Sequence, residues 1–179
     1  MNPGKRLDKL VRQCQKGDSR AWETVFTEFQ PRLRYYLRRF DCNGTDVEDL
    51  LQNVWSKALH KIDTLRDPRA FLAWLYRIAR NELLSHCRLQ DPWIEISDEQ
   101  MATIPDESNS DFTPEEGQRI HRALAHLKPN HREILTLSFL EALSHQQIAE
   151  ILDIHPGTVK SRIYHAKQSL RRMLEDSHE

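Results

Sequence analysis

Five cationic side chains lie near the C-terminus in a stretch that has no acidic residue. This stretch covers residues 154–174 and contains Lys160, Arg162, Lys167, Arg171 and Arg172. Each DNA phosphate that such a cation neutralises steepens the salt dependence of binding by about 0.9 log units per log unit of salt. Polar side chains at the start of a helix of this kind can also reach base edges in the major groove. The pattern therefore favours contact with duplex DNA over a merely solvated basic face.

The cations fall on the second helix of a predicted helix-turn-helix. Ser144 and Gln147 predict a capping box at the start of the first helix, and Pro156 suits the first turn of the second. Residues 153–155 form the turn between them, and Ala149 is small where the two helices must cross. We expect the exposed face of the second helix to carry Thr158, Lys160, Ser161, Arg162, Tyr164, His165 and Lys167.

The cysteines and histidines form no comparable pattern that would indicate catalysis or metal binding. Cys14, Cys42 and Cys87 are far apart with no C-x-x-C pair, which argues against a zinc site or a disulfide framework and favours buried or incidental thiols. The nine histidines are scattered, and none forms H-x-x-x-H with a nearby carboxylate. The sequence therefore predicts no enzyme activity, no cofactor and no metal.

The middle of the chain is acidic. Residues 89–118 contain nine acids and no Lys or Arg, which leaves 18 acids against 26 basic residues elsewhere. Charge segregation of this kind is typical of two basic modules with a polyanionic partner, and equally of an acidic linker between ordinary domains. Residues 91–112 show no helical period and hold Pro92 and Pro105, so we expect a flexible acidic linker there.

The remaining elements that would position these groups are predicted to be helices. Apolar residues from Val47 to Ile62 recur at helical spacing, after a capping box from Thr45 and Glu48. Asp67 is expected to cap the next helix, with Pro68 in its first turn. Five glycines in 179 residues suit helices better than a β-rich fold, so the predicted fold is all-α. No long apolar run or signal sequence is present, so we expect a cytoplasmic protein that is not inserted in a membrane.

Four segments resemble the extracytoplasmic-function (ECF, group 4) sigma factors of the sigma-70 family. Residues 143–149 (LSHQQIA) and 157–167 (GTVKSRIYHAK) resemble region 4 of these proteins. Residues 46–55 (DVEDLLQNVW) and 71–81 (FLAWLYRIARN) resemble region 2. The resemblance implies two small helical domains, region 2 at residues 1–90 and region 4 at 113–179, joined by the acidic linker at 91–112.

The resemblance also implies partners and residue roles. Core RNA polymerase would bind the chain through a coiled coil of its largest subunit. Promoter DNA would bind through its −10 and −35 elements. An anti-sigma factor is a further candidate partner. The residues matching the polymerase-binding face are Asp46, Glu48, Asp49, Gln52 and Asn53. Those matching the −10 reader are Arg66, Arg69, Tyr76, Arg77, Arg80, Asn81, Ser85 and Arg88. The −35 reader would be the exposed face of the last helix. Between the two aromatic candidates for base stacking, Tyr76 is expected to be exposed and Trp74 to lie in the core.

Two positions depart from the family pattern. Asp153 stands where glycine is usual, but Asp tolerates left-handed backbone geometry better than most residues. His165 stands where the family often has arginine, so one −35 contact should be altered. Two alternatives remain open: a non-sigma regulator with a helical sensor domain ahead of the helix-turn-helix, and a hydrolase or nuclease built on the scattered histidines and carboxylates.

Overall fold

The computed structural model describes residues 3–39, 47–90 and 123–176. The chain divides into two compact units, Met1–Ile94 and Glu95–Glu179. All regular elements within the described ranges are helical, which confirms the predicted all-α class. None of these helices combines the length and the apolar character needed to cross a membrane.

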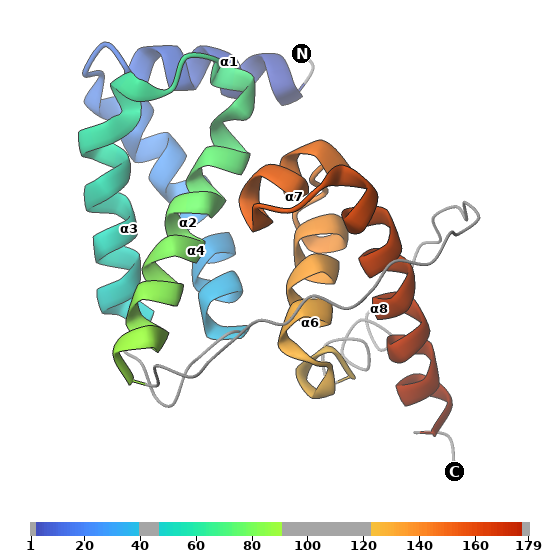
Figure 1. Cartoon of the computed structure of the whole chain (residues 1–179). Helices are drawn as coiled ribbons and strands as arrows, with labels where there is room; N and C mark the ends of the chain where they lie inside the picture. Colours follow the sequence, from blue (N-terminus) through green and yellow to red (C-terminus); the bar gives the residue numbers. More distant parts are fainter. Residues whose placement is uncertain (1–2, 40–46, 91–122, 177–179) are drawn as a thin grey trace. The chain divides into compact units, whose positions relative to one another are not determined.

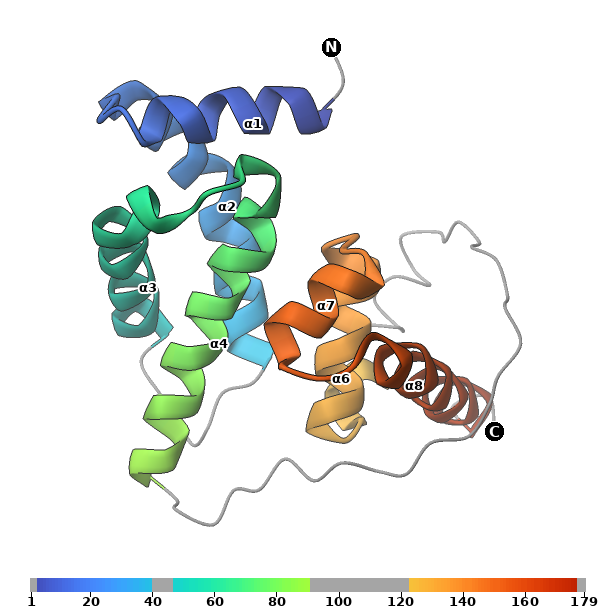
Figure 2. The same ribbon diagram turned by 45° about the horizontal axis from the view of Figure 1, so that its top comes forward.

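The first unit is a bundle of three long helices with a fourth lying across one end. Helices α2 (Ser19–Arg39), α3 (Val47–Lys61) and α4 (Phe71–Gln90) pack side by side. Helix α1 (Pro3–Cys14) crosses the end of the bundle (Figures 1 and 2). Two short 3-10 turns, η1 (Ile62–Thr64) and η2 (Pro68–Ala70), connect α3 to α4.

The sharp corner between α1 and α2 has a local cause. Gly17 adopts a φ of 80°, a backbone conformation that residues with a Cβ rarely take. Asp18 then caps α2, since its Oδ1 accepts hydrogen bonds from the amides of Arg20 at 2.9 Å and Ala21 at 3.3 Å. The Gln15 side-chain amide donates to the Leu65 carbonyl at 2.7 Å, which ties this corner to the α3–α4 connection.

Aromatic residues fill the centre of the bundle. Phe29 and Phe71 meet edge to face at 5.9 Å, and the rings of Tyr36 and Tyr76 meet at 5.3 Å and 90°. All four side chains are almost fully buried, as expected where three helices enclose a core. The arrangement places the outward faces of α3 and α4 in solvent.

The predicted start of α4 is confirmed with one refinement. Asp67 accepts a hydrogen bond from the Arg69 amide at 3.0 Å, with Pro68 following it, but the capped turn is the 3-10 turn η2, which leads directly into α4. The pKa of the Asp67 carboxyl is lowered, first by this backbone hydrogen bond and then by the Arg69 side chain. The capping residue proposed at Thr45 and the acidic linker proposed at 91–112 lie outside the described residues.

The cysteine prediction is confirmed where the structure describes it. Cys14 is buried at 2% exposure, and burial, together with the charge of Asp18, raises the pKa of its thiol to about 11. A thiol in this environment is inert at neutral pH. Cys42 and the side chain of Cys87 lie outside the described part of the chain.

The second unit is built on α6 (Pro129–Leu135), α7 (His145–Leu152) and α8 (Pro156–Asp176). One π-helical turn, η3 (Thr136–Leu140), continues α6. Helix α8 packs along α6 and α7, over a core that includes Ile134, Leu137 and Val159. Helix α6 lies beside α8, the second helix of the helix-turn-helix formed by α7 and α8 (Figure 1).

Candidate nucleic-acid and protein interfaces

The helix-turn-helix has the geometry that its sequence predicts. The Ser144 amide donates to the Gln147 side-chain carbonyl at 3.0 Å, and the Gln147 amide donates to the Ser144 hydroxyl at 3.3 Å, so the capping box is confirmed. Asp153 ends α7 in the left-handed conformation, at φ 57° and ψ 48°. The turn therefore survives the replacement of the usual glycine.

Helix α8 begins with a cap that the sequence did not reveal. The His155 Nδ1 accepts a hydrogen bond from the Gly157 amide at 3.0 Å, the bond that Ser or Asp usually supplies at a helix start. A Cβ on Gly157 would lie only 3.1 Å from that same nitrogen. Glycine at position 157 therefore gives the imidazole room to cap the N-terminal end of the helix.

The predicted −35 residues differ in exposure and fall into three groups. Lys160, Tyr164 and Lys167 are exposed and share one face, because they are four and three residues apart. Thr158, Arg162 and His165 are partly buried on the flanks of this face. Ser161 is a correction: it is only 8% exposed, and its hydroxyl donates to the Thr158 carbonyl at 3.1 Å, so it is not on the exposed face.

The predicted −10 residues also need one correction. Arg77, Asn81 and Ser85 are exposed at successive turns of α4, and Arg80 is partly buried beside them. Tyr76, expected to be the exposed aromatic, is fully buried against Tyr36. Trp74, assigned to the core, is only partly buried and packs on Phe71 at 5.9 Å. The prediction for Tyr76 is therefore wrong, and Trp74 is the more accessible of the two rings.

The remaining −10 candidates lie at the two ends of α4. Arg66 and Arg69 are exposed in the connection that precedes the helix. Arg69 forms an ion pair with the capping residue Asp67 at 3.3 Å. The side chain of Arg88 lies outside the described residues.

The polar face of α3 is exposed as predicted. Glu48, Asp49, Gln52 and Asn53 all face solvent, whereas Asp46 lies outside the described residues. Glu48 has a partner within the protein, because Arg34 of α2 donates to both of its carboxylate oxygens at 2.8 Å. These hydrogen bonds hold the pKa of the Glu48 carboxyl below its ordinary value.

An apolar groove runs beside this face, between α2 and α3. It encloses about 520 Å³, and its lining includes Phe26, Gln30, Asp49, Gln52, Trp55 and Leu59. Phe26 and Leu59 are 42% and 51% exposed, although both fall on apolar helical stripes that predict burial. Their exposure beside the charged face is the feature that sequence periodicity did not reveal.

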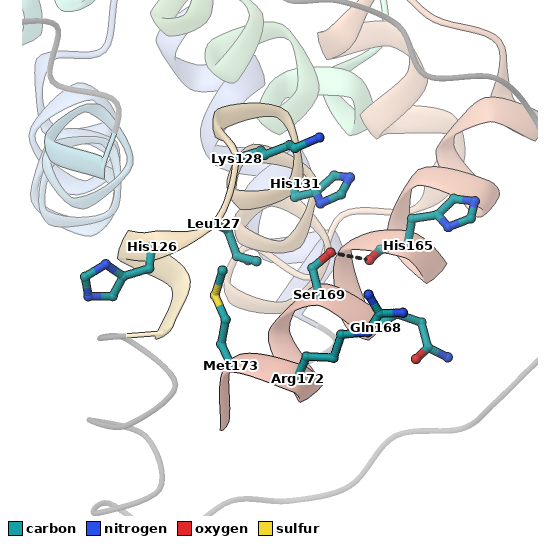
Figure 3. Close-up of a pocket in the computed structure, with 9 residues that line it drawn as sticks. All are labelled: His126, Leu127, Lys128, His131, His165, Gln168, Ser169, Arg172 and Met173. Atoms are coloured by element: carbon teal, nitrogen blue, oxygen red, sulfur yellow. Dashed lines mark hydrogen bonds between the residues drawn. The ribbon is translucent and has the colours of Figure 1, made fainter. Parts of the chain in front are cut away.

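A second hollow lies between α6 and α8. It also encloses about 520 Å³, with His131 and Lys128 on one wall and His165, Gln168, Ser169 and Arg172 on the other. Figure 3 shows the imidazoles of His126 and His165 on opposite sides of this pocket. No group of three His, Cys, Asp or Glu side chains in the described ranges could hold a metal ion.

These features define a class of protein: a helix-turn-helix DNA-binding unit linked to a helical bundle with an exposed acidic and amide face. Family models assign the two units separately. The family model described as "Sigma-70 region 2" matches residues 25–92, and the one described as "Sigma-70, region 4" matches residues 117–170.

Individual relatives agree with this assignment. The chain is 31% identical over 173 residues, 90% of each chain, to the ECF RNA polymerase sigma-E factor of Escherichia coli (strain K12). It is 27% identical over 179 residues, 93% of each chain, to the RNA polymerase sigma-H factor of Pseudomonas aeruginosa. The chain therefore belongs to the sigma-70 family, in its ECF group, and is a sigma factor that binds core RNA polymerase and directs it to promoters.

Solved structures show the same fold. The structure of CnrH in complex with the cytosolic domain of CnrY matches with a TM-score of 0.67 and 25% identity, over 95% of this chain and 97% of that one. The sigma factor RpoE of Bartonella quintana, in complex with the anti-sigma factor NepR, matches with a TM-score of 0.65 and 26% identity, over 86% and 96%. The family models disfavour the alternative of a non-sigma regulator, since region 2 occupies the place of the supposed sensor domain.

Proposed function

We propose that this sigma factor divides its work between three helix faces. The exposed face of α3, with the groove beside it, binds core polymerase; α4 engages the −10 element; and α8 engages the −35 element. The observation that carries this division is the contrast in charge between two exposed faces. Asp49, Gln52 and Asn53 present acceptors on α3, whereas Lys160 and Lys167 present cations on α8.

Polymerase binding would combine polar and apolar contacts. The Asp49 carboxylate and the Gln52 amide can accept hydrogen bonds from arginines on a partner helix, and the carboxylate bonds are charge-assisted. Phe26 and Leu59 line the adjacent groove and would lose exposed apolar surface on binding. An apolar centre with a polar rim is the usual anatomy of a protein interface. We therefore place Phe26 and Leu59 in the same interface as Asp49.

Promoter opening would use the exposed row on α4. Arg77 can contact a phosphate, and Asn81 one turn later can hydrogen-bond an unstacked base. Ser85 extends the same row by a further turn. Because Tyr76 is buried, base stacking at this site would fall to the partly exposed Trp74.

The −35 element would be recognised by the start of α8. Thr158, Lys160 and Arg162 lie in the first two turns, the part of a recognition helix that enters the major groove. Lys167 lies further along the exposed face and would contact phosphates. Residues 1–90 would act as the region 2 domain and residues 113–179 as the region 4 domain, with residues 91–112 as the link.

The same account covers catalysis, location and regulation. We infer that the chain itself carries out no chemical reaction, and that it acts in the cytoplasm, where RNA polymerase is. Two structural relatives are solved with protein partners, one of which is named as an anti-sigma factor. An anti-sigma factor that covers either interface would keep this chain inactive.

A reconstitution experiment tests the division of work. Purified chain is mixed with core polymerase, and binding and runoff transcription are both measured for Asp49→Ala and Lys160→Ala. The first variant should bind polymerase about tenfold more weakly, and the second should bind polymerase normally but use promoters poorly. The proposal fails if Asp49→Ala binds normally or if Lys160→Ala transcribes normally.

A further inference from the structure

Two large apolar side chains at the end of the π-helical turn η3 are exposed to solvent. Leu135, Thr136 and Leu137 are buried, whereas the next apolar pair, Phe139 and Leu140, is 45% and 41% exposed. The Glu141 amide donates to the Thr136 carbonyl at 3.2 Å, five residues back, which is the bond of a π-helix. The wider turn therefore sets the direction of Phe139.

Interactions at the start and the end of η3 hold this backbone arrangement in place. The Thr136 hydroxyl donates to the Arg132 carbonyl at 2.8 Å, and Ala142 leaves the turn with a φ of 51°. A π-helical turn is rare, and such turns are frequently found at functional sites. The exposure of Phe139 thus results from defined backbone geometry.

The ring of Phe139 meets a cation of α8. The Lys167 Nζ lies 5.0 Å from the ring centroid, within the range of a cation–π interaction. Lys167 shares the exposed face of α8 with Lys160 and Tyr164. One side of the ammonium is thereby held against a ring from η3, on the face proposed to meet DNA.

We propose that Phe139 is a positioning residue for DNA binding, which holds the Lys167 ammonium ready for a promoter phosphate. A lysine side chain is long and flexible, so holding it in advance lowers the entropy lost when it meets the phosphate. An acidic side chain in place of Phe139 would also hold the ammonium. It would, however, cancel the lysine charge and repel the phosphate, whereas the ring does neither.

This inference rests on the proposed role of α8 at the −35 element. Its test uses holoenzyme reconstituted from the full chain and core polymerase, bound to a promoter fragment whose −35 element has been mapped by runoff transcription. Four variants are compared: Phe139→Leu, Phe139→Trp, Lys167→Met, and Phe139→Leu combined with Lys167→Met. Leu keeps apolar bulk without a π face, and Trp keeps the π face.

The expected pattern is specific to a cation–π contact. Phe139→Leu should weaken promoter binding about two- to fivefold, and Phe139→Trp should bind like the parent chain. Lys167→Met should weaken binding and flatten the salt dependence by about 0.9 log units per log unit of salt. In the Lys167→Met background, Phe139→Leu should have no further effect. Thermal melting of each variant controls for folding.

Two results would overturn the inference alone. One is normal binding by Phe139→Leu while Lys167→Met is weakened. The other is an equal loss from Phe139→Leu with or without Lys167, which would show that Phe139 acts on folding. If Lys167→Met and Lys160→Ala both bind normally, the proposed DNA face of α8 is wrong instead.

Discussion

Arg34 of α2 donates two hydrogen bonds to the carboxylate of Glu48 of α3, each 2.8 Å long. The pair joins two helices of the bundle next to the face proposed to bind polymerase. Glu48 is one of the carboxylates assigned to that face, so part of its charge is already engaged within the chain. Glu48 therefore helps to join α2 to α3 in addition to its proposed role in polymerase binding, which distinguishes it from Asp49 and Gln52.

The first prediction concerns the titration of Glu48. Arg34→Ala should raise the pKa of the Glu48 carboxyl toward its ordinary value, because the side-chain hydrogen bond from Arg34 is the main cause of the lowering. Since the folded-state pKa is lowered, the pair stabilises the fold fully above pH 4.5 and loses its effect as pH falls through the folded value. Carboxyl-selective NMR titration of both chains measures this shift. An unchanged Glu48 titration in Arg34→Ala would refute the assignment.

The second prediction concerns polymerase affinity. Asp49→Ala and Gln52→Ala should each weaken core binding by about tenfold, or roughly 1.4 kcal/mol, and Leu59→Ser should do the same. All three side chains are exposed, so the free energy of unfolding should stay close to that of the parent chain. Fluorescence anisotropy with labelled chain measures the affinity. Lys61→Ala, an exposed change at the far end of α3, is the matched control.

The third prediction contrasts neighbours on α4. Tyr76→Ala should lower the free energy of unfolding by on the order of 3–5 kcal/mol, because it removes a fully buried ring from the bundle core. Arg77→Ala should leave that free energy nearly unchanged and instead reduce promoter opening. Urea denaturation and permanganate footprinting of the −10 region give the two readouts. A stable Tyr76→Ala chain would contradict the observed packing.

The burial of Tyr76 shows what the periodicity of apolar residues along one helix does not predict. The sequence predicts that Trp74 lies in the core of the bundle and that Tyr76 is exposed. Helix α4 packs against both α2 and α3, so its buried surface is wider than one stripe and takes in Tyr76. The buried face of α8 is likewise wider than the sequence predicts, since it includes Ser161. Which helices flank a face is tertiary information that spacing along one helix does not contain.

Local signals were more reliable, because capping depends on neighbouring residues only. The capping box at Ser144, the cap at Asp67 and the left-handed turn at Asp153 all followed from sequence. The Arg34–Glu48 pair joins separate helices, and the ring of Phe139 reaches Lys167 through an irregular turn. Neither contact has a signature in the sequence.

The fourth prediction concerns the turn of the helix-turn-helix. Asp153→Gly should stabilise the second unit by about 0.5–1 kcal/mol, because glycine adopts a positive φ without a Cβ penalty. Asp153→Val should destabilise it by roughly 1–2 kcal/mol, since a β-branched residue disfavours that conformation. Thermal unfolding of the full chain measures both. Equal stability of the Gly and Val variants would contradict the observed backbone.

The central claim is that one chain brings polymerase to promoters through separate protein-binding and DNA-binding faces. Runoff transcription with purified core polymerase on a fragment library tests it most directly. The account predicts defined transcripts that depend on the chain and that are reduced by either Asp49→Ala or Lys160→Ala. A chain that keeps its helices but neither associates with core polymerase at low salt nor directs any transcript would contradict the account.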